Sequence, residues 1–112
     1  NRFPVSGRVG YFRYFPGEYL MAFEDKASMR NARTHIGVEG VRTKVLFKQI
    51  AGFIARRIIA EVKVGETAVA GARFGMIRFG SRVDVLLPKG ADVRVACGQT
   101  TVAGETVLAT VP

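Results

Sequence analysis

The chain has 112 residues, of which 48% are hydrophobic and 23% charged, and it carries a formal net charge of +8. This length suits one domain with a real core, but it is short for a complete enzyme. The apolar content and the thirteen glycines argue against disorder and favour a β-rich globule. No apolar run approaches the roughly 18 residues of a membrane-spanning helix, and no signal peptide opens the sequence.

The positive charge indicates a polyanionic partner, because a basic surface attracts anionic lipid and nucleic acid at long range. The basic residues are scattered and no aromatic RNA-stacking motif accompanies them, so we expect an anionic membrane and no nucleic acid. Cys97 is the only cysteine, which excludes an intrachain disulfide, and we expect it to be buried. His35 is the only histidine; alone it cannot form a metal site, so no metal is expected, and a non-catalytic role is favoured.

In chain order, residues 1–24 combine aromatic and β-branched residues with turn signals, which predicts extended segments. Residues 25–43 are polar and lack hydrophobic periodicity, which predicts a loop or a short helical turn. Residues 44–64 are the most hydrophobic stretch and fit either a helix or two strands. Their β-branched content favours two strands broken at Gly52, which would cost a helix about 1 kcal/mol.

An internal repeat follows, in which residues 62–71 align with residues 95–104. Six of the ten aligned pairs are identical, and two of these are the pairs Gly65/Gly98 and Gly71/Gly104. Each copy predicts a strand, a glycine turn, a short strand and a second glycine turn. The pattern resembles the barrel-sandwich hairpins of biotinyl and lipoyl carrier domains. We therefore expect a mainly β, compact sandwich or barrel-sandwich fold, but not a carrier, because Lys89 lacks the small neighbours of a carrier lysine.

The peptide bond between Gly80 and Ser81 lies between the two copies. A glycine carbonyl followed by a serine hydroxyl is the minimum set of groups that a backbone N-to-O acyl shift requires. Glycine adopts the strained backbone of such a shift most easily. A Gly-Ser pair by itself is a weak signal, because most such pairs form turns.

The surrounding motifs are more specific, and together they resemble the short form of the phosphatidylserine decarboxylase family over nearly the whole chain. The most specific of them is Phe79-Gly80-Ser81-Arg82-Val83-Asp84. The others include Asn1-Arg2-Phe3-Pro4-Val5-Ser6-Gly7, Asn31-Ala32-Arg33, Gln49-Ile50-Ala51-Gly52 and Gly104-Glu105-Thr106-Val107.

This resemblance implies a proenzyme that cuts itself between Gly80 and Ser81. Ser81 attacks the Gly80 carbonyl, the ester undergoes β-elimination, and the dehydroalanine hydrolyses to a covalent pyruvoyl group with loss of ammonia. Residues 1–80 then form the β subunit, and residues 81–112 the α subunit, of a single catalytic domain. The pyruvoyl group forms a Schiff base with phosphatidylserine and accepts electrons as CO₂ leaves, which yields phosphatidylethanolamine.

The phosphodiester and carboxylate of that substrate need cations, and four arginines are candidates: Arg56, Arg57, Arg78 and Arg82. We prefer the two that flank the bond. The net charge would hold the protein peripherally on the cytoplasmic face of an anionic membrane.

The sequence also departs from the family. The family's upstream Asp-Val-His-Val and Ser-Pro-Ala-Asp-Gly motifs, implicated in self-cleavage and proton transfer, do not occur here. We therefore expect a C-terminal fragment that lacks the base activating Ser81 and that alone cleaves slowly or not at all. Asn31-Ala32-Arg33 lacks the family's central Glu. Two alternatives stay open, a non-catalytic module that binds anionic lipid or another polyanion and a decarboxylase of archaetidylserine, and so does a homo-oligomer.

Overall fold

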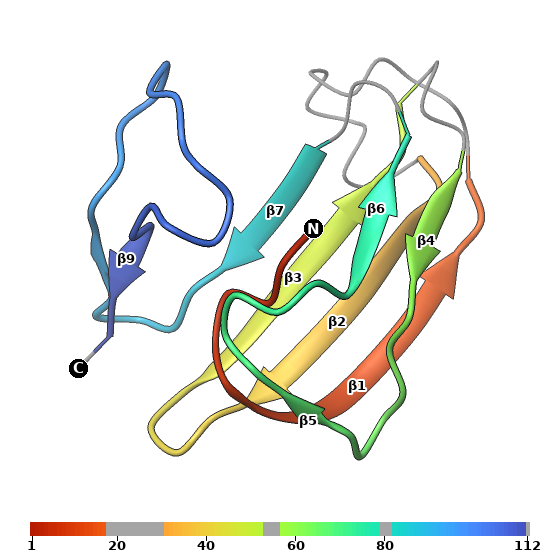
Figure 1. Cartoon of the computed structure of the whole chain (residues 1–112), viewed down its shortest axis with the longest axis horizontal. Helices are drawn as coiled ribbons and strands as arrows, with labels where there is room; N and C mark the ends of the chain where they lie inside the picture. The colour runs from red at the N-terminus through yellow and green to blue at the C-terminus, as the bar shows by residue number, and fades with distance from the viewer. Residues whose placement is uncertain (18–30, 53–56, 79–81, 112) are drawn as a thin grey trace.

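The computed structural model describes residues 1–17, 31–52, 57–78 and 82–111 (Figure 1). These residues form strands and no helix, which confirms the prediction of a mainly β fold. The strands are β1 (Gly7–Phe15), β2 (Arg33–Glu39), β3 (Lys44–Ile50), β4 (Ile58–Ala60), β5 (Thr67–Ala68), β6 (Gly75–Ile77), β7 (Arg82–Leu86), β8 (Asp92–Val93) and β9 (Ala109–Thr110). Within the described ranges there is no helix long and apolar enough to cross a membrane.

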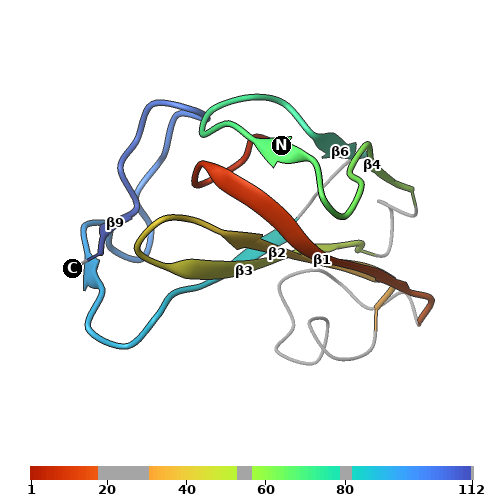
Figure 2. The same ribbon diagram turned by 90° about the horizontal axis from the view of Figure 1, so that it is seen from below.

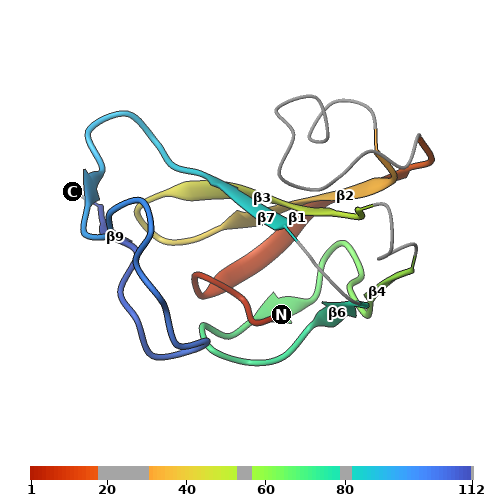
Figure 3. The ribbon, with the colours of Figure 1, turned by 90° about the horizontal axis from the view of Figure 1, so that it is seen from above.

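The largest sheet has five antiparallel strands in the order β5-β1-β2-β3-β7. Strand β4 pairs with β6, and β8 pairs with β9. Figures 2 and 3 view the large sheet along its edge and show β4, β6 and the first residues of the chain on one side of it. The core therefore lies between the sheet and this second layer.

Three phenylalanines from distant parts of the chain fill the centre of that core. Phe3 comes from the first residues, Phe47 from β3, and Phe74 from the segment before β6. Their ring centroids lie 4.9 to 6.2 Å apart, at the tilted and edge-on angles that aromatic pairs prefer. The rings thus join the second layer to the sheet.

The strand β2 corrects the sequence prediction, which placed residues 25–43 in a loop or helical turn. Thr34, Ile36 and Val38 point into the core and alternate with the outward Arg33, His35 and Gly37. The alternation was hard to recognise in the sequence because the inward Thr34 is polar and the outward Gly37 has no side chain. The two strands predicted over residues 44–64 are confirmed as β3 and β4.

The internal repeat is a repeat of backbone geometry. Gly65 and Gly98 have φ angles of 97° and 85°, in the left-handed region that glycine tolerates best. In the first copy, Lys63 N donates to Glu66 Oε1 at 3.0 Å. In the second copy, Ala96 N donates to Gln99 Oε1 at 3.1 Å, at the aligned positions. The sequence match between the two copies therefore reflects the same turn, formed once in each copy.

The two copies differ in their strand pairing. Thr67–Ala68 of the first copy form β5 against β1. In the second copy, the aligned Thr100 and Thr101 are exposed and belong to no strand. Cys97 lies in this exposed turn, so the prediction that it is buried is wrong. Val64, the residue aligned with Cys97 in the first copy, is also exposed, so this position of the turn faces solvent in both copies.

Candidate active site

Gly80 and Ser81 lie outside the described residues, but both flanks of their bond are described. Strand β6 ends at Ile77, and β7 begins at Arg82. Residues 79–81 therefore connect the β4–β6 pair to the edge of the five-stranded sheet. Figure 1 shows that the end of β3 and the beginnings of β2, β4 and β7 lie at the same end of the molecule. The described residues on the two sides of the candidate bond therefore belong to different layers.

Three of the four predicted arginines are described, and Arg56 lies outside the described residues. The backbone N–H of Arg78 donates to the carbonyl of Arg57 at 3.2 Å, which extends the β4–β6 pairing by one residue. Both arginines are exposed. The structure thus places the backbones of these two arginines side by side, directly beyond the paired residues of β4 and β6. Arg78 precedes Ser81 by three residues in the sequence.

Arg82 is engaged differently from the other two. It is half-buried, and its guanidinium forms a two-pronged ion pair with Asp84, with Nε–Oδ1 at 2.7 Å and Nη2–Oδ2 at 3.2 Å. Bidentate pairs of this kind fix the orientation of the arginine. Our preference for the pair Arg78 and Arg82 therefore needs refinement, since Arg82 is held by a carboxylate at the start of β7.

A buried polar group lies between the layers at the same end. Gln49 is fully buried, accepts a hydrogen bond from Thr34 Oγ1 at 2.9 Å, and donates through Nε2 to the Ile59 carbonyl at 3.3 Å. The buried Asn31 donates through Nδ2 to the Ala51 carbonyl. Buried polar groups are costly unless they are paired, so this network fixes β3 to both β2 and β4. Sequence analysis assigned it no role, although a glutamine on the inward face with Val45 and Phe47 was a usable signal.

Gly75 allows the β4–β6 pair to approach this network. A Cβ at this position would overlap the Ile59 carbonyl oxygen and lie 3.0 Å from Gln49 Nε2. Only glycine fits here without moving backbone atoms. Gly75 therefore sets the spacing of the strand that runs into Arg78 and the candidate bond.

The outward face of the large sheet carries a cationic and aromatic cluster near the same end. The guanidinium carbons of Arg13 and Arg33 lie 4.7 and 4.6 Å from the centroid of the Phe15 ring, within cation–π range. The His35 ring lies 4.5 Å from that of Phe15, and Arg33 Nε donates to His35 Nε2 at 3.3 Å. Desolvation and the charges of Lys48, Arg33 and Arg13 lower the pKa of His35, so it is neutral at pH 7.

Replacing Lys48 with glutamine is expected to raise the pKa of His35, because one of the charges that oppose protonation is removed. An NMR titration of the imidazole signals measures this shift, with Lys63→Gln as the control on an exposed residue outside the cluster. Since the folded-state pKa lies below the unfolded value, the stability that depends on neutral His35 is present above pH 6.5 and is lost as the pH falls through the folded pKa. An unchanged or lower pKa in Lys48→Gln would contradict this electrostatic account.

Comparison with known proteins identifies the family. The sequence model of the family described as phosphatidylserine decarboxylase matches residues 1–109. The chain belongs to this family. A phosphatidylserine decarboxylase proenzyme of Chlorobium luteolum is 49% identical over 109 residues, which are 97% of this chain and 51% of that protein. One of Prosthecochloris aestuarii is 46% identical over 112 residues, which are 100% of this chain and 52% of that protein.

The chain thus spans about half the length of the curated family members that it matches. No solved structure matches it. The family match includes Gly80, Ser81 and all four candidate arginines. In the described part of the chain, no group of three or more His, Cys, Asp or Glu side chains could hold a metal ion.

Proposed function

We propose that this chain carries the self-cleaving bond of a pyruvoyl-dependent phosphatidylserine decarboxylase, which converts phosphatidylserine to phosphatidylethanolamine and CO₂. The observation that carries the proposal is the family match over residues 1–109, together with relatives that are named proenzymes. Cleavage between Gly80 and Ser81 would divide one catalytic domain into a β subunit, residues 1–80, and an α subunit, residues 81–112.

The proposed cleavage rearranges the atoms of Gly80 and Ser81, consumes one water molecule and needs a base that takes up a proton. Ser81 Oγ bonds to the Gly80 carbonyl carbon, the C–N bond breaks, and the nitrogen takes the hydroxyl proton, which leaves an ester. A base then takes the Ser81 α proton, which expels the Gly80 carboxylate and leaves dehydroalanine; the proton finally leaves with the ammonia. Water replaces the nitrogen, ammonia leaves, and a pyruvoyl group remains at position 81.

The described residues around the bond fit such a group. The pyruvoyl carbonyl supplies an electrophile for the substrate amine and an electron sink for decarboxylation. Ile77, which is buried, pairs with the half-buried Ile58 just before the bond in the sequence. Such an apolar wall favours decarboxylation, because the charged carboxylate is less stable there than in water. Arg57 and Arg78 supply exposed positive charge beside this wall to hold the carboxylate or phosphodiester.

We further propose that the protein works at the surface of an anionic membrane, on its cytoplasmic face. The formal charge of +8 supports this, since each basic group near such a surface contributes about 1 kcal/mol of attraction. The membrane would then supply the phospholipid substrate directly to the site.

Reductive trapping tests the proposed function. The protein purified from its natural source is incubated with phosphatidylserine and cyanoborohydride, which reduces a Schiff base to a stable amine. We expect a covalent lipid adduct on the piece that begins at position 81. A module that merely binds anionic lipid forms no adduct, so lipid binding without trapping would overturn the proposal in favour of a non-catalytic module.

A further inference from the structure

The internal repeat extends further in the structure than in the sequence. The first copy, residues 62–71, connects β4 to β6, and the second copy, residues 95–104, connects β8 to β9. Both connections join antiparallel partners, and the offset that aligns the two copies also places β8 within the range of β4 and β9 within that of β6. The chain thus forms the same kind of hairpin twice, which we call the first hairpin, residues 58–77, and the second hairpin, residues 92–110.

The loops of the two hairpins contain a further matching turn. In the first hairpin, Ala72 N donates to the carbonyl three residues earlier at 2.9 Å, and Glu105 N, at the aligned position, does the same at 3.1 Å. Gly71 and Gly104, the third residues of these turns, have φ angles of 84° and 76°. Figures 2 and 3 show the loop of the second hairpin reaching back to the segment between β5 and β6, so the two turns lie near each other.

Arg2 lies between these two turns. Its Nη1 donates to the Gly71 carbonyl oxygen at 2.7 Å. A Cβ added to Gly104 would lie 2.9 Å from Arg2 Cδ and 3.3 Å from Arg2 Nε, so the side chain packs directly on the face of this glycine. The backbone of Arg2 is also fixed, because it forms a bridge with Arg73 beside the first turn. Arg2 thus connects the turn of one hairpin to the turn of the other.

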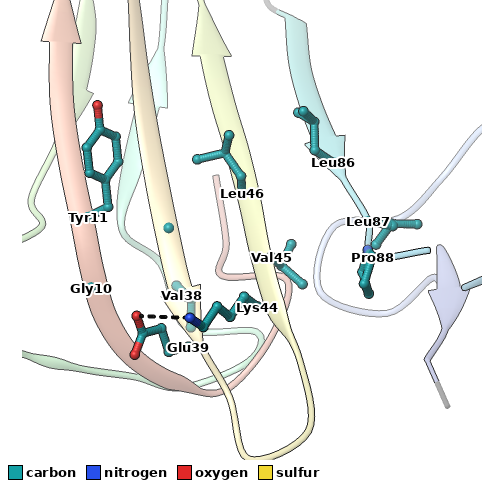
Figure 4. Close-up of a pocket in the computed structure, with 11 residues that line it drawn as sticks. Gly10, Tyr11, Val38, Glu39, Lys44, Val45, Leu46, Leu86, Leu87 and Pro88 are labelled. Carbon is teal, nitrogen blue, oxygen red and sulfur yellow. Dashed lines mark ion pairs between the residues drawn. The ribbon is translucent and has the colours of Figure 1, made fainter. Parts of the chain in front are cut away.

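The second hairpin forms its hydrogen bonds within itself. Leu87 and Pro88, which lead into it, line an apolar groove of about 280 Å³ with Tyr11 and Leu46 of the large sheet (Figure 4). Within the described ranges, the hydrogen bonds and the ion pair found for residues 88–111 all stay inside this segment. In that part of the chain, no hydrogen bond therefore replaces the packing contact between Arg2 and the second hairpin.

We propose that Arg2 holds the second hairpin against the first, and that it thereby joins the two chains produced by the proposed cleavage. Arg2 and the first hairpin belong to residues 1–80, whereas the second hairpin belongs to residues 81–112. The contact is formed by described residues, and only its role between separate chains rests on the proposed function. Once the bond is cut, the chains stay together through the pairing of β3 with β7 and through Arg2.

The two residue types suit this contact. A guanidinium keeps its charge at physiological pH, so its hydrogen bond to a carbonyl is charge-assisted. Alanine at position 104 would disturb the contact in two ways, since φ lies in the left-handed region and the new Cβ would overlap the Arg2 side chain. Gly98 has a similar φ of 85°, but no atom outside its chain neighbours lies within 4 Å of an added Cβ. Gly98→Ala therefore introduces the strain without the overlap.

Amide hydrogen exchange in uncut Ser81→Ala protein tests the contact without any need for cleavage. The reporters are the amides of Arg94 and Val102, whose acceptors lie inside the second hairpin. We expect Arg2→Ala to speed their exchange about fivefold and to leave the amides of β3 unchanged, because losing the contact makes opening of the hairpin less costly. The matched control is Arg73→Ala, which removes an exposed arginine beside Arg2 and should change exchange by no more than about twofold.

A double-mutant cycle separates the contact from the backbone strain. Gly98→Ala, and Gly104→Ala in protein that already carries Arg2→Ala, introduce strain alone, and we expect each to speed exchange about fivefold relative to its parent. In the presence of Arg2, Gly104→Ala also displaces the arginine, and we expect exchange about 25-fold faster. An effect of Gly104→Ala that is equal with and without Arg2 would overturn the contact, and so would unchanged exchange in Arg2→Ala.

The role between chains is tested in protein that has been cleaved. Gel filtration in a series of urea concentrations measures the release of the chain that begins at position 81. We expect Arg2→Ala to release this chain at lower urea than Arg73→Ala does. Equal release would overturn the joining role while the exchange results keep the contact. A natural protein that is never cleaved would overturn both the proposed function and the joining role, and the exchange results would then decide the contact alone.

Discussion

Replacing Ser81 with alanine is expected to leave the protein in one piece and to abolish both decarboxylation and reductive trapping. Alanine has no hydroxyl to attack the Gly80 carbonyl, and it cannot eliminate to dehydroalanine. The loss is complete, because no pyruvoyl group forms. Denaturing electrophoresis and mass spectrometry measure the cleavage, and release of CO₂ from phosphatidylserine measures the activity.

The matched variant is Ser81→Thr, which keeps the hydroxyl. We expect it to cleave more slowly and to leave a ketone with one additional methyl group, because the β-branched side chain restricts rotation about χ1. The mechanism would be contradicted by an alanine variant that is still cleaved into two chains, or by one that keeps full decarboxylase activity.

The substitution Gly75→Ala is expected to lower stability and to slow cleavage. The new Cβ overlaps the Ile59 carbonyl and crowds Gln49 Nε2 at 3.0 Å, so β6 must move away from β4. Overpacking of this kind costs about 2 kcal/mol, which corresponds to a melting temperature lower by roughly 10 °C in a domain of this size. Because β6 leads into Arg78 and the bond, its displacement also misaligns the cleavage site.

Gly98→Ala is the control for this substitution. Gly98 has a φ of 85°, but no atom outside its chain neighbours lies within 4 Å of an added Cβ. The change therefore carries only backbone strain, of order 1 kcal/mol, in a turn outside the candidate site. Equal effects of both substitutions on cleavage would show that Gly75 acts through overall stability alone.

The parts of the fold that could be predicted are those whose signal is local. Strand β3 alternates Val45, Phe47 and Gln49 toward the core, and the break at Gly52 separates it from β4. The repeat was visible because Gly65 and Gly98 occupy φ angles that few other residues tolerate. Strand β2 was missed because its pattern contains a buried threonine and an outward glycine. Cys97 was misplaced because an apolar residue type does not show that this position of the turn faces solvent, as it also does for the aligned Val64.

The candidate site likewise has parts that the sequence predicts and parts that it does not. The bond and its flanking arginines are read from adjacent residues, whereas the cationic cluster joins Arg13, Arg33 and Lys48 from three strands. That cluster depends on the register of β1, β2 and β3, which a single sequence does not give. The role of Gln49 likewise depends on Ile59, whose carbonyl it meets only because β4 returns over the inward face of the large sheet.

The mass of the fragment that begins at position 81 tests the central claim most directly. The protein is purified from its natural source, denatured and analysed intact. We predict two chains, the second starting at position 81 with a mass lower by one ammonia than a chain with an amino-terminal serine, and carrying a ketone that reacts with a hydrazide. A single uncut chain, or a fragment beginning with unmodified Ser81, would contradict the account.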